Sequence, residues 1–396
     1  MNKTYLEINL DTLRNNTKYI VNKYIGYKYY FGVVKSNAYG HGEYIVNELI
    51  KGGINYIAVT YLEEALKVRE YNKDIPILCF APIDLEDLDI AIKNNITITI
   101  ADLTYLEYLI KKITKNIKVH IKLDTGMNRL GFKDKNKLDE AYKLINENKF
   151  LELEGIYTHL STVGLHEKTY DNQINRFKEL TENINLKKIP IIHLTSSANL
   201  VSHDKIDFAN GVRLGSILYG FNPTIRTSNK GIINKLRNLR NKYMQKKYNL
   251  SKVYTDVELD IKPALKMYSN ILQIKAVKKG EYIGYGLSYK AKENVKIAIV
   301  PVGYNNGIGF GINSHYVYIK DKKYYVAGQT SMNMIAIIVD DDININDKVE
   351  LINDKLTPKT LASFTNKLTI EILLAIGHAN KKVYTLNEKI VKEIEP

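Results

Sequence analysis

The sequence predicts an α/β fold: a (β/α)8 barrel of the TIM type, followed by a second, smaller C-terminal all-β domain. Three observations support this prediction. The chain has 396 residues, which is more than one hydrophobic core usually supports. Short β-branched or aromatic runs alternate with helix-patterned stretches in the first half, and this alternation stops after about Phe221. We therefore expect the barrel at residues 1–222, a basic helical linker at 223–256 and the β-domain at 257–396.

Eight apolar runs are expected to form the parallel strands of the barrel. These runs are Tyr29–Val34, Tyr56–Val59, Ile75–Phe80, Thr97–Ile100, Lys118–Leu123, Leu153–Thr158, Ile191–Leu194 and Val212–Leu214. Between them, Leu62, Ala65 and Leu66 have the spacing of one helix face, and residues 103–113 repeat the pattern. The alternation alone also fits a doubly wound open sheet, which is the structural alternative.

The second half of the chain has the pattern of a small β-domain. Its short strand-like runs are Ile271–Val277, Val295–Val300, Tyr316–Ile319, Tyr324–Val326, Ile335–Val339 and Lys348–Leu351. We expect residues 1–9 to form a strand that joins this domain. The linker contains Lys230–Lys247, a segment with seven Lys or Arg and no acidic residue.

Composition excludes several classes of protein. Hydrophobic residues make up 45% of the chain and charged residues 25%, and no apolar run approaches the roughly 18 residues of a membrane span. The N-terminus has no apolar signal segment, so we expect a cytoplasmic protein without a membrane partner. Cys79 is the single cysteine, which excludes a disulfide within the chain and a cysteine-based metal site, and we expect no metal.

The net charge of +14 raises the question of a nucleic-acid partner. Half of this charge lies in Lys230–Lys247, and the other lysines are dispersed, which disfavours a phosphate-binding face. Binding of nucleic acid or of a membrane surface through this one segment is an alternative function.

Polar and ionisable residues follow the predicted barrel strands, at the strand ends where the active sites of such barrels lie. Lys35 comes directly after the first strand, and an ammonium there is costly to desolvate unless its pKa falls. A neutral lysine amine can form a Schiff base, although a lysine that merely extends from the barrel rim is the structural alternative. The turns at Thr195–Ser197 and Gly215–Ser216 offer hydroxyl and N–H groups to a phosphate.

The ordered set of motifs resembles the alanine racemases, which are fold-type III enzymes that use pyridoxal 5′-phosphate (PLP). Val33–Gly42 resembles the PLP-lysine signature of that family, and Lys122–Gly131 resembles its second signature. Further matches occur in the same order at Tyr157–His159, Ser196–Ala198, Val212–Gly215, Tyr219–Gly220, Tyr285–Gly286, Gly303–Tyr304 and Ser331–Met332. The resemblance implies racemisation of a small amino acid with PLP, in the first place L-alanine to D-alanine for cell-wall peptidoglycan precursors.

The resemblance also implies roles for individual residues. Lys35 and Tyr285 would be the two catalytic groups, and because the family takes this tyrosine from the partner subunit, a homodimer with shared active sites is implied. Arg213 would donate a hydrogen bond to the pyridine nitrogen, and His159 with Arg213 would favour the phenolate of Tyr285. The residues implied to contact the phosphate are Tyr39, Ser197, Gly215 and Ser216.

Other matches concern the substrate. Arg129 and the backbone N–H of Met332 would bind its carboxylate, with Tyr304 and Asn333 in support. Lys122 matches a lysine that is carbamylated in many relatives, and an unmodified Lys122 held by water or chloride is the alternative.

Two positions depart from the family pattern. Asn333 stands where most relatives have aspartate, and Ile370 stands where they have a tyrosine that narrows the pocket. Serine, lysine or a broad range of amino acids are therefore alternative substrates.

Two other PLP proteins with a similar barrel are alternatives. A decarboxylase would need an acidic partner for the ring nitrogen and a cysteine near the C-terminal domain, whereas this chain has Arg213 and no cysteine after Cys79. A non-catalytic PLP-binding homeostasis protein would lack the β-domain that residues 257–396 predict.

Overall fold

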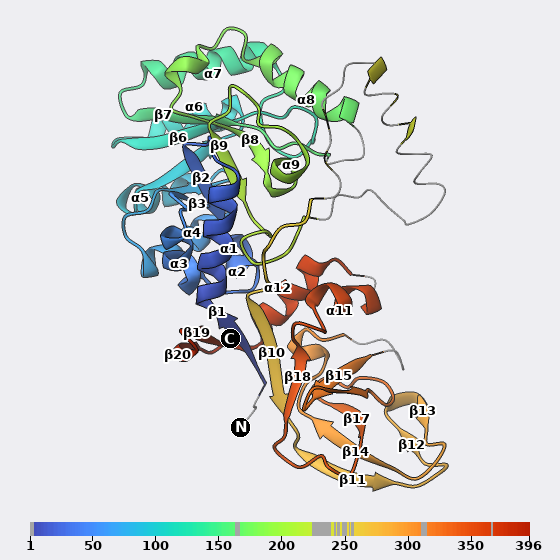
Figure 1. Ribbon diagram of the computed structural model, residues 1–396. Helices are drawn as coiled ribbons and strands as arrows, with labels where there is room; N and C mark the ends of the chain where they lie inside the picture. Colours follow the sequence, from blue (N-terminus) through green and yellow to red (C-terminus); the bar gives the residue numbers. More distant parts are fainter. Residues whose placement is uncertain are drawn as a thin grey trace. The chain divides into compact units, whose positions relative to one another are not determined.

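The computed structural model of the chain shows two compact units (Figure 1). One comprises Arg14–Lys35 and Val46–Ile261, and the other comprises Met1–Leu13, Ser36–Ile45 and Lys262–Pro396. The structure describes residues 4–162, 167–223, 239–240, 243, 246–247, 252, 254, 257–309, 315–365 and 367–396. No helix in these ranges has the length and apolar character needed to cross a membrane.

The first unit is a closed barrel of eight parallel strands. Its strands are β2 (Tyr29–Val33), β3 (Tyr56–Val59), β4 (Ile77–Cys79), β5 (Ile96–Ile100), β6 (Ile117–Lys122), β7 (Leu151–Tyr157), β8 (Ile191–Ser196) and β9 (Gly211–Leu214). Every residue of β3, β4, β5 and β9 is buried, as parallel strands covered on both faces require. Each of the eight predicted runs overlaps one of these strands, so the predicted barrel is confirmed and the open sheet is excluded.

Within this unit, the helices between the strands lie on the outside of the barrel (Figure 1). The helices up to β9 are α1 (Leu10–Lys23), α2 (Lys35–Tyr39), α3 (Val46–Lys51), α4 (Leu62–Tyr71), α5 (Leu88–Lys93), α6 (Leu103–Lys112), α7 (Lys135–Glu147), α8 (Glu167–Leu180) and α9 (Ser197–Ser202). Aspartates cap the N-termini of α6 and α7. The side chain of Asp102 accepts a hydrogen bond from the backbone N–H of Tyr105, and that of Asp134 accepts one from the backbone N–H of Lys137. These caps satisfy backbone donors that a helix start leaves free.

The second unit is built mainly from β-sheets. Its seven-stranded sheet has the order β16-β15-β18-β10-β1-β19-β20, with β1 (Tyr5–Asn9), β10 (Leu265–Asn270), β15 (Tyr316–Ile319), β16 (Lys322–Tyr325), β18 (Lys348–Ile352), β19 (Lys381–Leu386) and β20 (Lys389–Ile394). The remaining strands are β11 (Gln273–Val277), β14 (Val295–Val300) and β17 (Ile335–Val339) in one sheet, and β12 (Tyr282–Ile283) and β13 (Tyr289–Lys290) in a hairpin. Strand β1 runs antiparallel to β10 and parallel to β19.

The predicted β-domain is confirmed as part of the fold class, and each of its six predicted runs overlaps a strand. The sequence did not predict two helices in this unit, α11 (Pro358–Thr365) and α12 (Thr369–Ala379). The basic segment Lys230–Lys247 falls largely outside the described residues. The domain boundaries 1–222, 223–256 and 257–396 stay a prediction.

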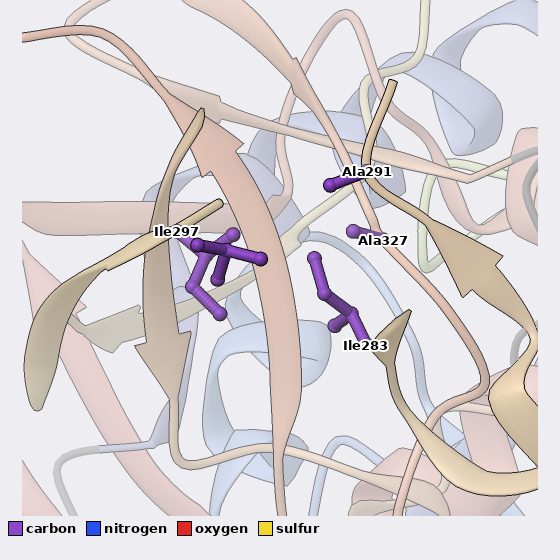
Figure 2. Packing of buried hydrophobic residues seen from close by; sticks show 5 residues of the cluster. Ile283, Ala291, Ile297 and Ala327 are labelled. Atoms are coloured by element: carbon purple, nitrogen blue, oxygen red, sulfur yellow. The ribbon is translucent and has the colours of Figure 1, made fainter. Parts of the chain in front are cut away.

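A small hydrophobic cluster supports the hairpin of β12 and β13. It consists of Val277, Ile283, Ala291, Ile297 and Ala327, which are all buried. Figure 2 shows the last four of these side chains gathered between the hairpin and the neighbouring sheet. The side chains of Tyr285 and Leu287 in the hairpin connection are exposed, so the buried contacts that support the hairpin come from this cluster.

Candidate active site

Lys35 is placed by the first strand of the barrel. The preceding residues Val33 and Val34 are buried, and the hydroxyl of Tyr219 donates a hydrogen bond to the carbonyl of Val33 at 2.9 Å. The Lys35 side chain itself is half-buried. Burial and the nearby charge of Arg129 lower the pKa of Lys35, against the opposing effect of Glu64. The fold therefore increases the fraction of Lys35 that is a neutral, nucleophilic amine.

The segment after Lys35, drawn as α2, is not an ordinary helix. Ser36, Asn37, Ala38 and Tyr39 have φ angles of 53°, 55°, 48° and 54°, so four consecutive residues adopt the left-handed conformation. Such a run is rare for residues other than glycine and is kept only where the surrounding fold enforces it. Burial raises the pKa of Tyr39 to about 12, which keeps its phenol protonated and able to donate a hydrogen bond.

Arg213 lies on β9, next to β2, and its side chain is almost fully enclosed by acceptors. Nη1 donates to the ring Nδ1 of His193 at 2.8 Å and to the His193 carbonyl at 2.7 Å. Nη2 donates to the carbonyls of Thr158 and Leu194 at 2.8 and 3.0 Å, and lies 3.3 Å from Nδ1 of His159. Among the described residues, Nε has no hydrogen-bond partner, so one N–H of the guanidinium is free for a ligand.

The site disfavours the protonated, positively charged forms of both His159 and Lys122. Burial, followed by the charges of Arg213 and Arg129, lowers the pKa of His159 well below its usual value. Burial and Arg213 likewise lower the pKa of Lys122 to about 7, although Asp124 opposes the shift. Nζ of Lys122 donates to the carbonyl of Leu123 at 2.6 Å. Arg213, whose pKa burial lowers only to about 10, stays charged at neutral pH.

Arg129 is presented by a loop that Asp124 organises. The Asp124 carboxylate accepts the backbone N–H groups of Gly126 and Asn128, each at 3.0 Å. Gly131 closes the loop at a φ of +116°, and a Cβ there would lie 2.6 Å from the backbone of Leu123. Arg129 itself is exposed. The loop thus presents an exposed cation whose charge acts on Lys35 and Lys122.

The candidate phosphate residues of the barrel lie side by side. Ser197, the first residue of α9, uses its hydroxyl oxygen to accept the backbone N–H of Gly215 at 2.8 Å. Ser216 follows directly and is partly exposed. The hydroxyl groups of Ser197 and Ser216, the amine of Lys35 with its lowered pKa and the free N–H of Arg213 are groups that suit the phosphate, the aldehyde and the ring nitrogen of PLP. The residues present therefore fit this cofactor.

The other predicted residues belong to the second unit. Tyr285 lies between β12 and β13 and is 67% exposed. Tyr304 and Met332 are neighbours, because the N–H of Tyr304 donates to Ser331 and that of Asn305 to Met332. Gly303 allows this approach, since a Cβ there would lie 2.2 Å from the Ser331 carbonyl oxygen. Asn333 beside them is exposed.

Three ionisable residues of the barrel were missed from the sequence. His120, Glu154 and His193 lie within β6, β7 and β8 and are buried, and they connect to Arg213 through hydrogen bonds. The available signal was their position: an ionisable side chain in the middle of an apolar strand is rarely buried without a partner. Residues at the strand ends give no information about these three positions.

The sequence matches known proteins over both units. Residues 8–223 match the family "Alanine racemase, N-terminal domain", and residues 264–384 match "Alanine racemase, C-terminal domain". The alanine racemase of Borreliella burgdorferi (strain ZS7) is 34% identical, and the alignment covers 97% of each chain. The solved alanine racemase of Clostridium difficile 630 is 31% identical, with a TM-score of 0.85 over 99% of this chain and 98% of that one. A histidine racemase from Leuconostoc mesenteroides shares the fold at 22% identity and a TM-score of 0.82, covering 97% of this chain and 98% of that one. Both the barrel, with Lys35 and Arg213, and the β-sheets of the second unit match, and this chain belongs to the alanine racemase family.

Proposed function

We propose that this chain is an alanine racemase that interconverts L-alanine and D-alanine with PLP. The observation that carries the proposal is that Lys35 follows β2 while Arg213 lies on β9, the strand that pairs with β2 in the barrel. One is an amine whose pKa is lowered by burial, and the other is a buried guanidinium with a single free N–H. A relative named alanine racemase matches 97% of the chain, which supports the same activity.

The barrel supplies the groups that would hold the cofactor. Lys35 would bind its aldehyde carbon, and Ser197, Gly215 and Ser216, together with Tyr39, would bind its phosphate. Arg213 would donate Nε–H to the ring nitrogen and, because a guanidinium does not give up its proton at neutral pH, would keep that nitrogen unprotonated. When bound, PLP supplies a conjugated ring that withdraws electrons from the substrate Cα.

Two groups of the protein would move the proton. Lys35 Nζ would remove or return the Cα proton on one face of the substrate, and the phenol of Tyr285 of the partner subunit would act on the other face. The exposure of Tyr285 supports this arrangement, because a buried tyrosine could not reach a second copy. His159, which its low pKa keeps neutral, would orient the phenol by hydrogen bonding, and Arg213 would supply the positive charge.

The substrate carboxylate would be bound by Arg129 and the backbone N–H of Met332, beside Tyr304. Asn333 and the half-buried Ile370 on α12 remove a negative charge and a phenol from the family pattern. Serine, lysine or a broad range of amino acids are the alternative substrates. We further propose a cytoplasmic homodimer that supplies D-alanine for peptidoglycan precursors.

The test is a screen of L-amino acids for loss of optical rotation with added PLP, together with the variant Lys35→Ala. The wild type should turn yellow with PLP and act on L-alanine, whereas Lys35→Ala should lack both the colour and the activity. Lys133→Ala, which removes an exposed lysine 3.9 Å from the Asp124 carboxylate, is the matched control and should keep both. Retained colour in Lys35→Ala would refute the assignment of the cofactor lysine.

A homeostasis protein without catalytic activity is the second candidate. It would bind PLP at Lys35 but would leave the rotation of every amino acid in the screen unchanged. The described residues of the second unit, with Tyr285 on its hairpin, favour the racemase.

A further inference from the structure

A chain of hydrogen bonds runs from Arg213 into the interior of the barrel. Nη1 of Arg213 lies 2.8 Å from Nδ1 of His193, and Nε2 of His193 lies 3.1 Å from Nδ1 of His120. Nε2 of His120 lies 3.2 Å from Oε2 of Glu154. The four side chains come from the adjacent strands β9, β8, β6 and β7, and all are buried.

The chemistry of its two ends gives this chain one direction. Arg213 has only donors, so Nδ1 of His193 must accept and its Nε2 must carry the proton. Nδ1 of His120 then accepts, its Nε2 carries the proton, and the Glu154 carboxylate receives it. Burial lowers the pKa of both imidazoles, which agrees with two neutral rings in the Nε2–H tautomer.

The rings have little freedom to turn. His193 stacks against Phe31 and Tyr157, with centroids 4.6 and 4.5 Å away and interplanar angles of 16° and 12°. His120 fills the space above Gly155, where a Cβ would lie 2.5 Å from the imidazole Cε1. Packing therefore fixes the ring planes, and the hydrogen bonds fix which nitrogen carries the proton.

Glu154 is the common acceptor at the far end. Its Oε2 accepts the hydroxyl of Tyr56 at 2.6 Å, and its Oε1 accepts Nζ of Lys118 at 2.7 Å. Burial alone would raise the pKa of Glu154, but the bonds from His120, Lys118 and Tyr56 lower it to about 2. The acceptor thus stays ionised at any working pH, and the chain has a charged donor at one end and a charged acceptor at the other.

We propose that His193, His120 and Glu154 are positioning residues that hold Arg213 with its Nε–H free for the ligand. If His193 changed tautomer, its Nδ1–H would face an N–H of Arg213, and the guanidinium would have to turn. If His120 changed tautomer, its Nδ1–H would face the Nε2–H of His193, and His193 would have to change as well. Hydrogen bonds in such a chain also polarise one another, so the carboxylate acts on Arg213 through both rings. The consequence for the cofactor rests on the function proposed above, whereas the tautomers do not.

The deciding variant is Glu154→Met, which keeps an unbranched side chain but removes both acceptor oxygens. Glu154→Gln can still turn its carbonyl oxygen toward His120 and should largely rescue the chain, at the expense of the Lys118 contact. Lys118→Met and Tyr56→Phe are matched controls, because each removes one donor to Glu154 and leaves the chain to Arg213 intact.

The first measurement is ¹⁵N NMR of histidine-labelled protein, with and without PLP. We expect His120 and His193 of the wild type and both controls to be Nε2–H tautomers, and Glu154→Met to lose this single state. In the PLP-loaded enzyme, kcat of Glu154→Met should fall about tenfold to a hundredfold, by analogy with residues that orient metal ligands, with little change in KM.

Either of two results would overturn the proposal. A wild type with an Nδ1–H or doubly protonated ring would do so even if Glu154→Met did not fold. Glu154→Met with unchanged tautomers and the kcat of Lys118→Met would also do so. If the screen detects no racemisation but the tautomers are as expected, the proposed function fails and the chain of hydrogen bonds stands.

Discussion

The two lysines of the barrel site differ in how far their charge is suppressed. Lys122 is more deeply buried than Lys35 and lies near the guanidinium groups of Arg213 and Arg129, and its pKa falls to about 7. Folding therefore disfavours the ammonium form. The sign follows: stability is lost as the pH falls from about 10.5, where the unfolded lysine gains its proton, to about 7, where the folded one does.

A neutral buried amine beside two cations is suited to carbamylation, in which Nζ attacks CO2 and loses a proton. We predict that protein incubated with ¹³C-bicarbonate shows a carbamate signal in ¹³C NMR that grows as the pH rises through about 7. The resulting anion would pair with Arg129 in a charge-assisted hydrogen bond. Lys122→Met should lack the signal and Lys133→Met should keep it. A signal that survives in Lys122→Met would place the carbamate elsewhere, and no signal in the wild type would favour the unmodified lysine.

Among individual residues, the sequence pointed to ionisable side chains at the ends of the strands but not to those in the interior of the barrel. Lys35 stood out because a cation at the end of an apolar strand needs an explanation, whereas the role expected of Arg213 came from the resemblance to a family. His193 and Glu154 could not be predicted, because a role for them depends on which strands become neighbours. The distance from His193 to His120 is a property of the closed barrel and of no local pattern.

The hairpin of β12 and β13 is so short that its position depends on packing against the rest of the second unit. It has two residues in each strand, so its own hydrogen bonds cannot hold it in place. Ile283 in β12 packs into the cluster with Ala291, Ile297 and Ala327 (Figure 2). The position of the exposed Tyr285 thus depends on an aliphatic side chain two residues earlier.

We predict that Ile283→Ala lowers the free energy of unfolding by roughly 2–5 kcal/mol, the usual range for emptying a buried isoleucine site. It should also reduce kcat more than it weakens PLP binding, since it loosens Tyr285 and leaves the barrel intact. Val295→Ala, at a partly buried position of the same cluster, should cost less on both counts. Urea denaturation and steady-state kinetics measure the two effects. Equal losses in the two variants would argue against a special role for Ile283.

Elements were predicted best where residue type and periodicity agree. The β-branched repeat of β5, Ile96–Ile100, indicates a strand without tertiary information. The helices α11 and α12 were missed because short strand runs dominate the segment around them. The left-handed turn of α2 could not be predicted either, because Ser, Asn, Ala and Tyr have no strong intrinsic preference for a positive φ.

For the whole molecule, the proposed dimer means that one chain cannot catalyse racemisation alone. Lys35 would act with Tyr285 of the partner subunit, and an isologous dimer would contain two such mixed sites. The exposure of Tyr285 and of Leu287 beside it leaves an aromatic and an aliphatic side chain available for a second copy.

Mixing two inactive variants tests this directly. Lys35→Ala and Tyr285→Phe should each be nearly inactive, but a renatured equal mixture should regain about a quarter of the wild-type activity, because half the dimers are mixed and each has one intact site. Racemisation of L-alanine by the mixture, followed by polarimetry, gives the measurement. No recovery in a mixture that sedimentation shows to be dimeric would mean that both groups act within one chain.

Position 38 has an unexpected stereochemical preference. Ala38 is buried with a φ of 48°, in a backbone shape that is the mirror image of the common right-handed turn. This conformation costs an L-residue roughly 1–2 kcal/mol of conformational free energy, whereas a D-residue adopts it without that cost. If the chain were assembled by chemical ligation, D-alanine at position 38 should therefore suit the native backbone better than L-alanine. The protein proposed to produce D-alanine would then be more stable with one D-alanine in its own chain.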